Sequence, residues 1–420
     1  MNIIFYFSDQ QRFDTFTPEV MPNLCSLTEE DGASFQNAYS PQPVCGPCRA
    51  ILQSGVYQNE NGCYINGISL KTKATLAKYF KEGGYETAYV GKWHLASDML
   101  RFNVEKKPIP KERLGGYEYF RGADVLEFTS HGEDGFIFTE EGQRLDFKGV
   151  RCDAIEGYAE EFIRNRDKNK PFFLFISQLE PHHQNDRKTY ECPEEDRIKF
   201  EATKLPEDLA VGKGDAPKEF PSYLGLIHRL DKNLGRLVST LKAEGIYEDT
   251  IIIYTSDHGC HFKTRNSEYK RSCHDSSIHV PLVILNSRFN GSCTQMVSLI
   301  DLPPTLLHLA GLEIPKHFKG YSLLKGPARE AVYVQISESI LGRALRTEKY
   351  TYAIKSKKNG YLCKDSSLYY EDFLYDNKKD PHQQQNLIKD PNYDAIKEDL
   401  KKLLLREMEK AGELIPEIRG

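Results

Sequence analysis

The chain has 420 residues, long enough to bury a large core, so we expect one large domain and a smaller one. Lysine and arginine number 56 against 61 aspartates and glutamates, a formal net charge of −5, and no long run of one charge sign occurs. This balance excludes a basic nucleic-acid binder and a polybasic membrane patch. No stretch approaches the roughly 18 apolar residues of a membrane span, so we expect neither nucleic acid nor membrane as a partner.

The first residues, Met1 to Ser8, are apolar but run directly into polar sequence. They predict a buried strand and not a signal peptide. The ten cysteines lack the regular spacing of a secreted disulfide scaffold, which favours free thiols in a reducing cytosol. We therefore expect a cytoplasmic protein, with an exported form if a leader has been removed.

Strand-like and helical patterns alternate along most of the chain. Runs rich in Ile, Phe, Tyr and Val predict strands at residues 3–7, 87–90, 172–177, 251–255 and 282–285. Apolar residues at three- and four-residue spacing predict helices at 76–81, 154–166, 223–243 and 302–310. This alternation predicts an α/β fold with helices on a mostly parallel sheet. The polar segments 101–148 and 185–221 are predicted to be long excursions that shape a substrate pocket.

The last part of the chain has a different texture. Short tyrosine-rich runs predict strands at 331–336, 343–346, 350–354 and 372–375, followed by a helix at 393–410. We predict a small antiparallel sheet with one terminal helix. The predicted units are an α/β domain at 1–326, which carries the site residues, and a C-terminal subdomain at 327–420.

A cysteine motif, Cys45-Gly46-Pro47-Cys48-Arg49, has several interpretations. As Cys-X-X-Cys it matches the redox motif of thioredoxin, in which a helix N-terminus lowers the thiol pKa. That motif normally follows an aromatic residue, whereas Val44 precedes it here, and the rest of the chain would go unexplained. Inert, buried structural thiols are a second interpretation. The third, Cys-X-Pro-X-Arg, depends on other motifs.

Two acidic pairs follow predicted strands: Asp9-Gln10 and Asp257-His258. The carboxyl ends of strands are where open α/β sheets build their sites, so the two pairs could share one ion, although helix capping is the commoner use of either pair alone. Carboxylate and amide oxygens suit calcium or magnesium, and the imidazole shifts the preference toward manganese. The sequence therefore predicts one divalent metal, calcium first, with manganese or magnesium as alternatives.

Taken in order, these segments resemble the type I, formylglycine-dependent sulfatase family of the alkaline phosphatase superfamily. The matching features are Cys-X-Pro-X-Arg at 45–49, Gly-Lys-X-His at 91–94, Pro-His at 181–182, Lys270 about ten residues before Val280-Pro281-Leu282, and the two strand-end pairs. The resemblance spans most of the chain. It implies an alkaline-phosphatase-like sheet and the hydrolysis of a sulfate monoester.

The resemblance also implies how the nucleophile arises. A separate maturation enzyme would oxidise Cys45 to formylglycine (3-oxoalanine), whose hydrate supplies the attacking hydroxyl and joins Asp9, Gln10, Asp257 and His258 around the metal. Arg49, by the same resemblance, supports the formylglycine and the metal without reacting.

Four further residues acquire roles in the same way. The resemblance implies that Lys92 and His94 hold the ester oxygens, that Lys270 binds sulfate, and that His182 protonates the departing alcohol. His183, Gln184 and Asn185 follow directly and are candidate substrate contacts. Together with the polar excursions, Gln184 and Asn185 favour a sulfated sugar over a flat aryl sulfate or a steroid. The expected partner is a small-molecule or oligosaccharide sulfate ester.

Alternatives remain open. The family's commoner pairs are Asp-Asp and Asp-Asn, and the departure to Gln10 and His258 also resembles the phosphonate monoester hydrolase branch. A phosphonate monoester or phosphodiester hydrolase is therefore an alternative. A non-catalytic glycan-binding relative with unmodified Cys45 is another, opposed by the complete set Lys92, His94, His182 and Lys270.

Overall fold

The structure is a computed structural model that describes residues 1–72, 74–99 and 101–420. Within these residues a ten-stranded sheet has the order β10-β2-β9-β8-β1-β7-β3-β4-β5-β6. Its strands are β1 Asn2–Ser8, β2 Gly32–Tyr39, β3 Glu86–Lys92, β4 Tyr119–Ala123, β5 Asp134–Thr139, β6 Arg144–Lys148, β7 Phe172–Ser177, β8 Thr250–Ser256, β9 Leu282–Leu285 and β10 Gly291–Ser298. The central strands β8, β1, β7, β3 and β4 pair in parallel, which confirms the predicted α/β fold.

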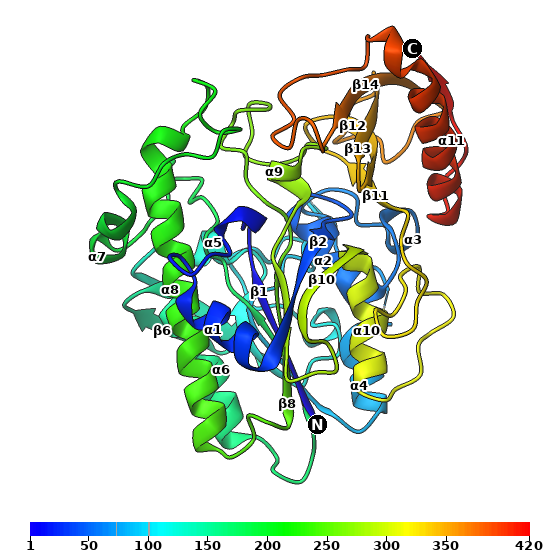
Figure 1. Ribbon diagram of the computed structural model, residues 1–420. Helices are drawn as coiled ribbons and strands as arrows, with labels where there is room; N and C mark the ends of the chain where they lie inside the picture. The colour runs from blue at the N-terminus through cyan, green and yellow to red at the C-terminus, as the bar shows by residue number, and fades with distance from the viewer. Residues whose placement is uncertain (73, 100) are drawn as a thin grey trace.

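Helices cover both faces of this sheet (Figure 1). One face carries α1 Pro22–Asp31, α6 Arg151–Asn165 and α8 Ala216–Ala243, and the other carries α2 Cys45–Ser54, α4 Leu76–Glu82 and α10 Leu302–Leu309. Shorter helices are α3 Gln58–Asn61, α5 Leu126–Thr129, α7 Glu194–Arg197 and α9 Asp275–Ile278, with 3-10 turns at Phe13–Thr15, Lys111–Arg113, Ile198–Phe200, Leu299–Asp301 and Pro391–Tyr393. The helices predicted at 76–81, 154–166, 223–243 and 302–310 correspond to α4, α6, α8 and α10.

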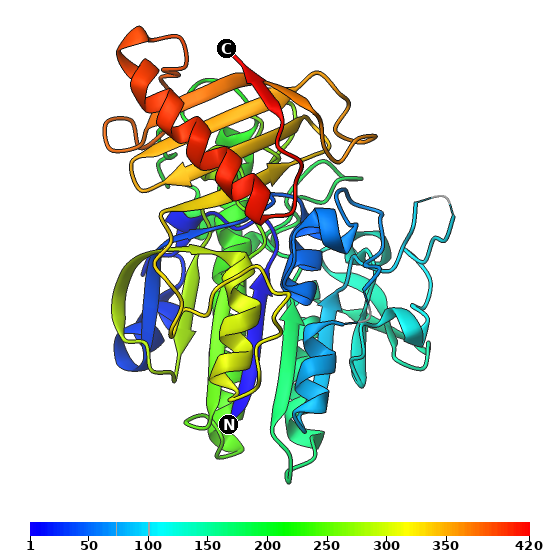
Figure 2. The ribbon, with the colours of Figure 1, turned by 90° about the vertical axis from the view of Figure 1, so that its right-hand side faces the viewer.

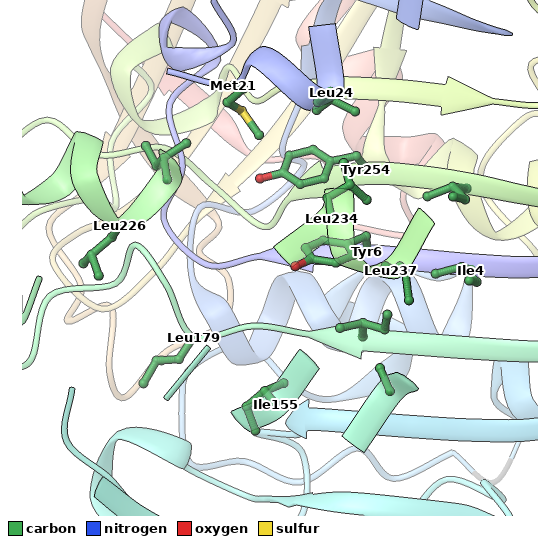
Figure 3. Packing of buried hydrophobic residues seen from close by; sticks show 14 of the residues in the cluster. Ile4, Tyr6, Met21, Leu24, Ile155, Leu179, Leu226, Leu234, Leu237 and Tyr254 are labelled. Carbon is green, nitrogen blue, oxygen red and sulfur yellow. The ribbon is translucent and has the colours of Figure 1, made fainter. Parts of the chain in front are cut away.

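The first strand shows how one continuous apolar run serves two cores. Successive side chains of a strand point to opposite faces, so Ile4 and Tyr6 belong to the core under α1, α6 and α8. Ile3, Phe5 and Phe7 belong to the core on the other face. Figure 3 shows Ile4 and Tyr6 near Leu234 and Leu237 of α8. Burial on both faces explains why this strand shows no polar alternation.

Two segments predicted as excursions belong in part to the scaffold. Residues 101–148 contain β4, β5 and β6, and β5 and β6 extend the sheet edge as an antiparallel hairpin. Residues 185–221 contain α7 and the start of α8, which begins at Ala216. The prediction missed this start because Pro217 and Pro221 break the helical pattern. Pro217 lies in the first turn, where proline is tolerated because backbone N–H groups lack partners, whereas Pro221 lies inside the helix.

The C-terminal part forms a second sheet in the order β11-β12-β13-β14-β15, with α11 Asp394–Lys410 lying across it (Figure 2). Its strands are β11 Ala331–Ile336, β12 Leu341–Thr347, β13 Tyr350–Ser356, β14 Leu368–Asp376 and β15 Glu417–Arg419. The first four pair antiparallel, as predicted, and the short β15 adds a parallel pair with β14. The domain boundary at 326/327 falls in the loop before β11 and stays a prediction.

The second sheet packs directly on the first unit. Val332, Val334 and Ile336 of β11 share an apolar cluster with Tyr39 and Ile278. This contact places the C-terminal sheet beside the end of β2 and the loop that carries α9. Among the described residues, no helix combines the length and apolar character needed to cross a bilayer.

Candidate active site

Four parallel strands end at the same level of the central sheet. Ser8 of β1 pairs with Ser256 of β8, and Phe7 pairs with Ser177 of β7. Gly91 of β3 also pairs with Ser177. The residues that follow these positions therefore meet at one edge of the sheet, as expected for a site in an open α/β fold.

The end of β3 requires a glycine. Gly91 has a φ of +109°, and a Cβ at this position would lie 1.9 Å from the carbonyl oxygen of Ser177. Only glycine allows this close approach of β3 to β7. The next residue, Lys92, is fully buried and donates a hydrogen bond of 2.8 Å from Nζ to Asp9 Oδ2.

Cys45 is the first residue of α2, and the whole helix is buried. Pro47 lies in the first turn, where its missing N–H costs nothing, and the helix ends at Gly55 in the left-handed region. The backbone N–H of Gly46 donates to Asn66 Oδ1 at 2.9 Å. Unpaired N–H groups and the dipole of a helix N-terminus favour negative charge at the Cys45 position.

The side chains of Asp9, Asp257 and His258 converge on Cys45. One ligand atom from each of Asp9, Cys45, Asp257 and His258 lies within 4.8 Å of the others, and all four residues are buried. Cys45 Sγ lies 3.2 Å from His258 Nε2 and 3.6 Å from Asp9 Oδ1. Asp257 Oδ2 is buried without a hydrogen-bond partner. An orphaned carboxylate oxygen at the centre of such a group is a ready ligand for a cation.

Gln10 adjoins this group in a strained conformation, with a φ of 73°. Its side-chain nitrogen donates to the Tyr190 hydroxyl at 3.0 Å, and its backbone N–H donates to Asp257 Oδ1 at 2.9 Å. Among the described residues, the Gln10 side-chain oxygen accepts no hydrogen bond. The side chain is thus fixed by its nitrogen, which leaves the oxygen available as the predicted ligand.

The charges at the site favour an anion at position 45 and a cation beside it. Although burial raises it, Lys270, Lys92 and His258 hold the pKa of the Cys45 thiol well below its ordinary value. Lys270 Nζ donates to Cys45 Sγ at 2.7 Å. Burial, together with the charge of Asp9, raises the pKa of Asp257. Two buried carboxylates and a neighbouring anion are the setting in which a divalent cation is favoured.

Arg49 ties these groups together from the first turns of α2. Its NH2 donates to Asp9 Oδ2 at 2.9 Å, and its NH1 donates to the Ser177 hydroxyl at 2.5 Å. NH2 also lies 3.8 Å from Asp257 Oδ2. The guanidinium therefore fixes the carboxylates and the end of β7 without contacting the Cys45 sulfur, in keeping with its predicted supporting role.

The predicted general acid, His182, lies beside both Lys270 and Cys45. His182 Nε2 is 3.3 Å from Lys270 Nζ, and His182 Nδ1 is 3.3 Å from Glu127 Oε2. The sequence analysis missed Glu127, which lies in α5 within a segment predicted to be an excursion. Although burial raises it, His182 and Lys92 hold the pKa of this carboxyl below its ordinary value. No local sequence pattern marks Glu127, because only the fold brings it here.

His94 reaches the site less directly than predicted. Its backbone has a φ of 59°, its N–H donates to the Asp124 carbonyl at 2.6 Å, and its buried Nδ1 has no hydrogen-bond partner. Among the described residues, no hydrogen bond joins its imidazole to Cys45.

The three candidate substrate contacts differ in their freedom. Gln184 is engaged within the protein: Oε1 accepts from Arg151 at 3.1 Å and Nε2 donates to the Glu127 carbonyl at 2.9 Å. Its bonds favour holding the loop over contacting substrate. His183 stacks on Tyr269 and keeps a buried, unpartnered Nε2, while Asn185 Nδ2 donates to Glu127 Oε1 at 2.9 Å.

The C-terminal sheet reaches the site through one carboxylate. Glu338, in the turn after β11, forms an ion pair with Arg271, the neighbour of Lys270, and accepts from the backbone N–H of Asn66 at 2.7 Å. Asn66 in turn accepts from Gly46, next to Cys45. Glu338 is therefore connected to both segments that flank the nucleophile position.

Comparison with known proteins decides the family. The family model "Sulfatase" matches residues 1–312, and "N-sulphoglucosamine sulphohydrolase, C-terminal" matches residues 267–410. The chain belongs to the sulfatase family. The predicted resemblance is thereby confirmed, and with it the enzyme class, the sulfuric ester hydrolases.

Relatives of this sulfatase extend over nearly its whole length. An ulvan-active sulfatase of Formosa agariphila is 27% identical, over 98% of this chain and 82% of its own. An N-acetylglucosamine-6-O-sulfatase of Bacteroides thetaiotaomicron is 26% identical, over 96% and 85%. The solved structure of a putative sulfatase from Bacteroides fragilis is 22% identical over 99% of this chain and 96% of its own, with a TM-score of 0.83. The last likeness shows the fold, including the C-terminal sheet.

Family membership excludes the thioredoxin interpretation of the cysteine motif. The motif forms the first turn of α2, and no disulfide joins any of the ten cysteines, all of which lie in the described part of the chain. Cys45 contacts Lys270 and His258, whereas burial raises the pKa of Cys48, which lies 3.7 Å from the Ser40 hydroxyl. The two thiols therefore lie in different surroundings and do not form a redox pair.

Proposed function

We propose that the protein removes sulfate from a sulfated carbohydrate, using formylglycine at Cys45 and one divalent metal. The observation that carries the proposal is the position of Cys45, at a helix N-terminus with Lys270 at 2.7 Å and three metal-ligand candidates within 4.8 Å. The formylglycine hydrate, when formed, would supply the attacking hydroxyl at this position. The ulvan and N-acetylglucosamine specificities in the relatives' names support a carbohydrate substrate.

The residues around Cys45 fit a hard divalent cation. Asp9, Asp257 and the Gln10 amide oxygen offer oxygen ligands, and His258 adds one nitrogen. This set would bind calcium in preference, with manganese or magnesium as alternatives. The bound cation would stabilise a negatively charged oxygen at position 45. Arg49 and Lys92 each donate to Asp9 Oδ2, so Asp9 Oδ1 remains available to bind the cation.

The remaining residues divide into sulfate binding and proton transfer. Lys92 and Lys270 bring two buried ammonium groups toward the Cys45 position, where they would stabilise charge on the sulfuryl oxygens, and His94 would help hold the ester oxygens. His182 beside Lys270 would protonate the departing sugar oxygen. His183 and Asn185 would contact the sugar, and Gln184 would hold their loop.

The test has two stages. The protein is produced with a formylglycine-generating maturation enzyme, and the Cys45 peptide is weighed for the loss of about 18 mass units expected when thiol becomes aldehyde. The modified protein is then assayed on sulfated monosaccharides. Cys45→Ala should abolish turnover, whereas Cys48→Ala should retain it. Full modification without turnover of any sulfate ester would contradict the proposal.

A second candidate function rests on Gln10 and His258. This pair in the metal group also resembles the phosphonate monoester hydrolase branch, and the same hydroxyl could attack phosphorus. Comparing kcat/KM on matched sulfate and phosphonate monoesters separates the two functions. A preference for the phosphonate would replace the sulfatase proposal while leaving the nucleophile unchanged.

A further inference from the structure

Glu127 is a buried carboxylate held from three directions. Its Oε1 accepts from Asn185 Nδ2 at 2.9 Å, and its backbone oxygen accepts from Gln184 Nε2 at 2.9 Å. Its Oε2 lies 3.3 Å from His182 Nδ1 and 3.8 Å from Lys92 Nζ. The side chain is 9% exposed. Glu127 therefore cannot turn away from His182 without breaking the hydrogen bond to Asn185.

The other edge of the His182 ring faces the reacting position. Nε2 lies 3.3 Å from Lys270 Nζ, which itself lies 2.7 Å from Cys45 Sγ. The imidazole thus spans the space between Glu127 and the nucleophile, and its side chain is 6% exposed. Nδ1 is buried and, among the described residues, makes no hydrogen bond of good geometry, so Glu127 Oε2 at 3.3 Å contacts it as an ion-pair partner. A carboxylate at this distance from Nδ1 favours one ring orientation and a proton on that nitrogen, which leaves Nε2 to exchange a proton with substrate.

The surrounding charges make a carboxylate useful at this place. Lys92 Nζ lies 3.8 Å from Glu127 Oε2, and Lys270 Nζ lies 3.3 Å from His182 Nε2, so Glu127 places a negative charge among two buried ammonium groups. A neutral side chain would keep the packing but not the charge.

We propose that Glu127 is a positioning residue that holds His182 through Nδ1, so that Nε2 delivers a proton to the departing ester oxygen. The proton passes from Nε2 to that oxygen, which keeps the electron pair of the broken S–O bond, and Glu127 stays ionised throughout. This inference rests on the proposed sulfatase function. It assigns Glu127 no contact with the substrate.

The experiment uses the dependence of rate on the leaving group. Protonation matters most for a sugar alcohol, less for phenol, and least for nitrophenol, which leaves readily as an anion. In the formylglycine-modified protein, Glu127→Gln should lower kcat about 100-fold on a sulfated monosaccharide, about 10-fold on phenyl sulfate, and less than about 3-fold on para-nitrophenyl sulfate. His182→Ala should show the same order with larger losses.

A matched control is Glu160→Gln, which neutralises another buried carboxylate, one that pairs with Arg164 and Arg236 outside the site. It should leave all three rates unchanged. If Glu127→Gln does not fold, Glu127→Asp keeps the charge but withdraws the carboxylate from His182 Nδ1, and it should give smaller losses in the same order of substrates.

The outcomes distinguish this inference from the function on which it rests. Equal losses on all three substrates, or no loss, would overturn the role of Glu127 while leaving the sulfatase intact. A modified wild-type protein that hydrolyses none of the three sulfates would overturn the proposed function, and this inference with it.

Discussion

Lys270→Met tests the electrostatic core of the site. Lys270 is 5% exposed and its ammonium lies 2.7 Å from Cys45 Sγ, so it would face charge that develops at the nucleophile and on the sulfuryl oxygens. Removing one buried donor to developing charge costs about 2.7–4 kcal/mol, or about 100- to 1,000-fold in kcat. Methionine keeps most of the side-chain volume, so the loss should be in rate and not in folding.

The assay is kcat and KM on a sulfated monosaccharide, with the mass of the Cys45 peptide and the thermal midpoint measured on the same sample. The matched control is Lys263→Met in the same loop, where the ammonium pairs with Asp215 at 2.8 Å and the side chain is 39% exposed. It should change kcat less than about 3-fold. A loss of less than about 10-fold for fully modified Lys270→Met would refute the reasoning.

Three further predictions follow from the metal group and the buried carboxyls. Chelation should abolish turnover and lower the thermal midpoint, because Asp9 and Asp257 are left close together and buried; no change in either would argue against the metal. Burial raises the pKa of Glu156 to about 8, so folding favours its protonated form and wild-type stability should fall, relative to Glu156→Gln, as pH rises from about 4.5 to 8, by at most about 1.4 kcal/mol per pH unit. If the free energies of unfolding of the two proteins change equally with pH across that range, this prediction is wrong. Glu338→Ala should destabilise the protein by about 1–3 kcal/mol, since Arg271 keeps only its more exposed partner Glu268 and the backbone N–H of Asn66 loses its acceptor, and denaturant unfolding would show this.

The sequence predicted the part of the site that lies on strand ends. Asp9, Lys92 and Asp257 each follow an apolar run, and parallel strands that end at one level bring such residues together. This reasoning needs only the run and the residue after it. It could not reveal formylglycine, which came from resemblance to the family.

Other features depend on tertiary contacts that leave no local pattern. Glu127 reaches His182 because β4 joins the sheet edge, in a segment whose charge and glycine content indicated a loop. The side-chain orientation of Gln10 depends on the distant Tyr190. Short edge strands such as β5 and β6 pair through their backbones, so their mixed side chains show no clear period.

The complete burial of α2 bears on whether the proposed modification of Cys45 comes before or after folding. All ten residues of the helix, from Cys45 to Ser54, are buried. In the folded chain the proposed maturation enzyme would therefore have no access to the segment around Cys45. Conversion of the thiol would therefore have to take place on the nascent or unfolded polypeptide, before α2 docks. The rate of modification would then compete with the rate of folding. A chain that folds before Cys45 is modified would remain inactive until it unfolds again.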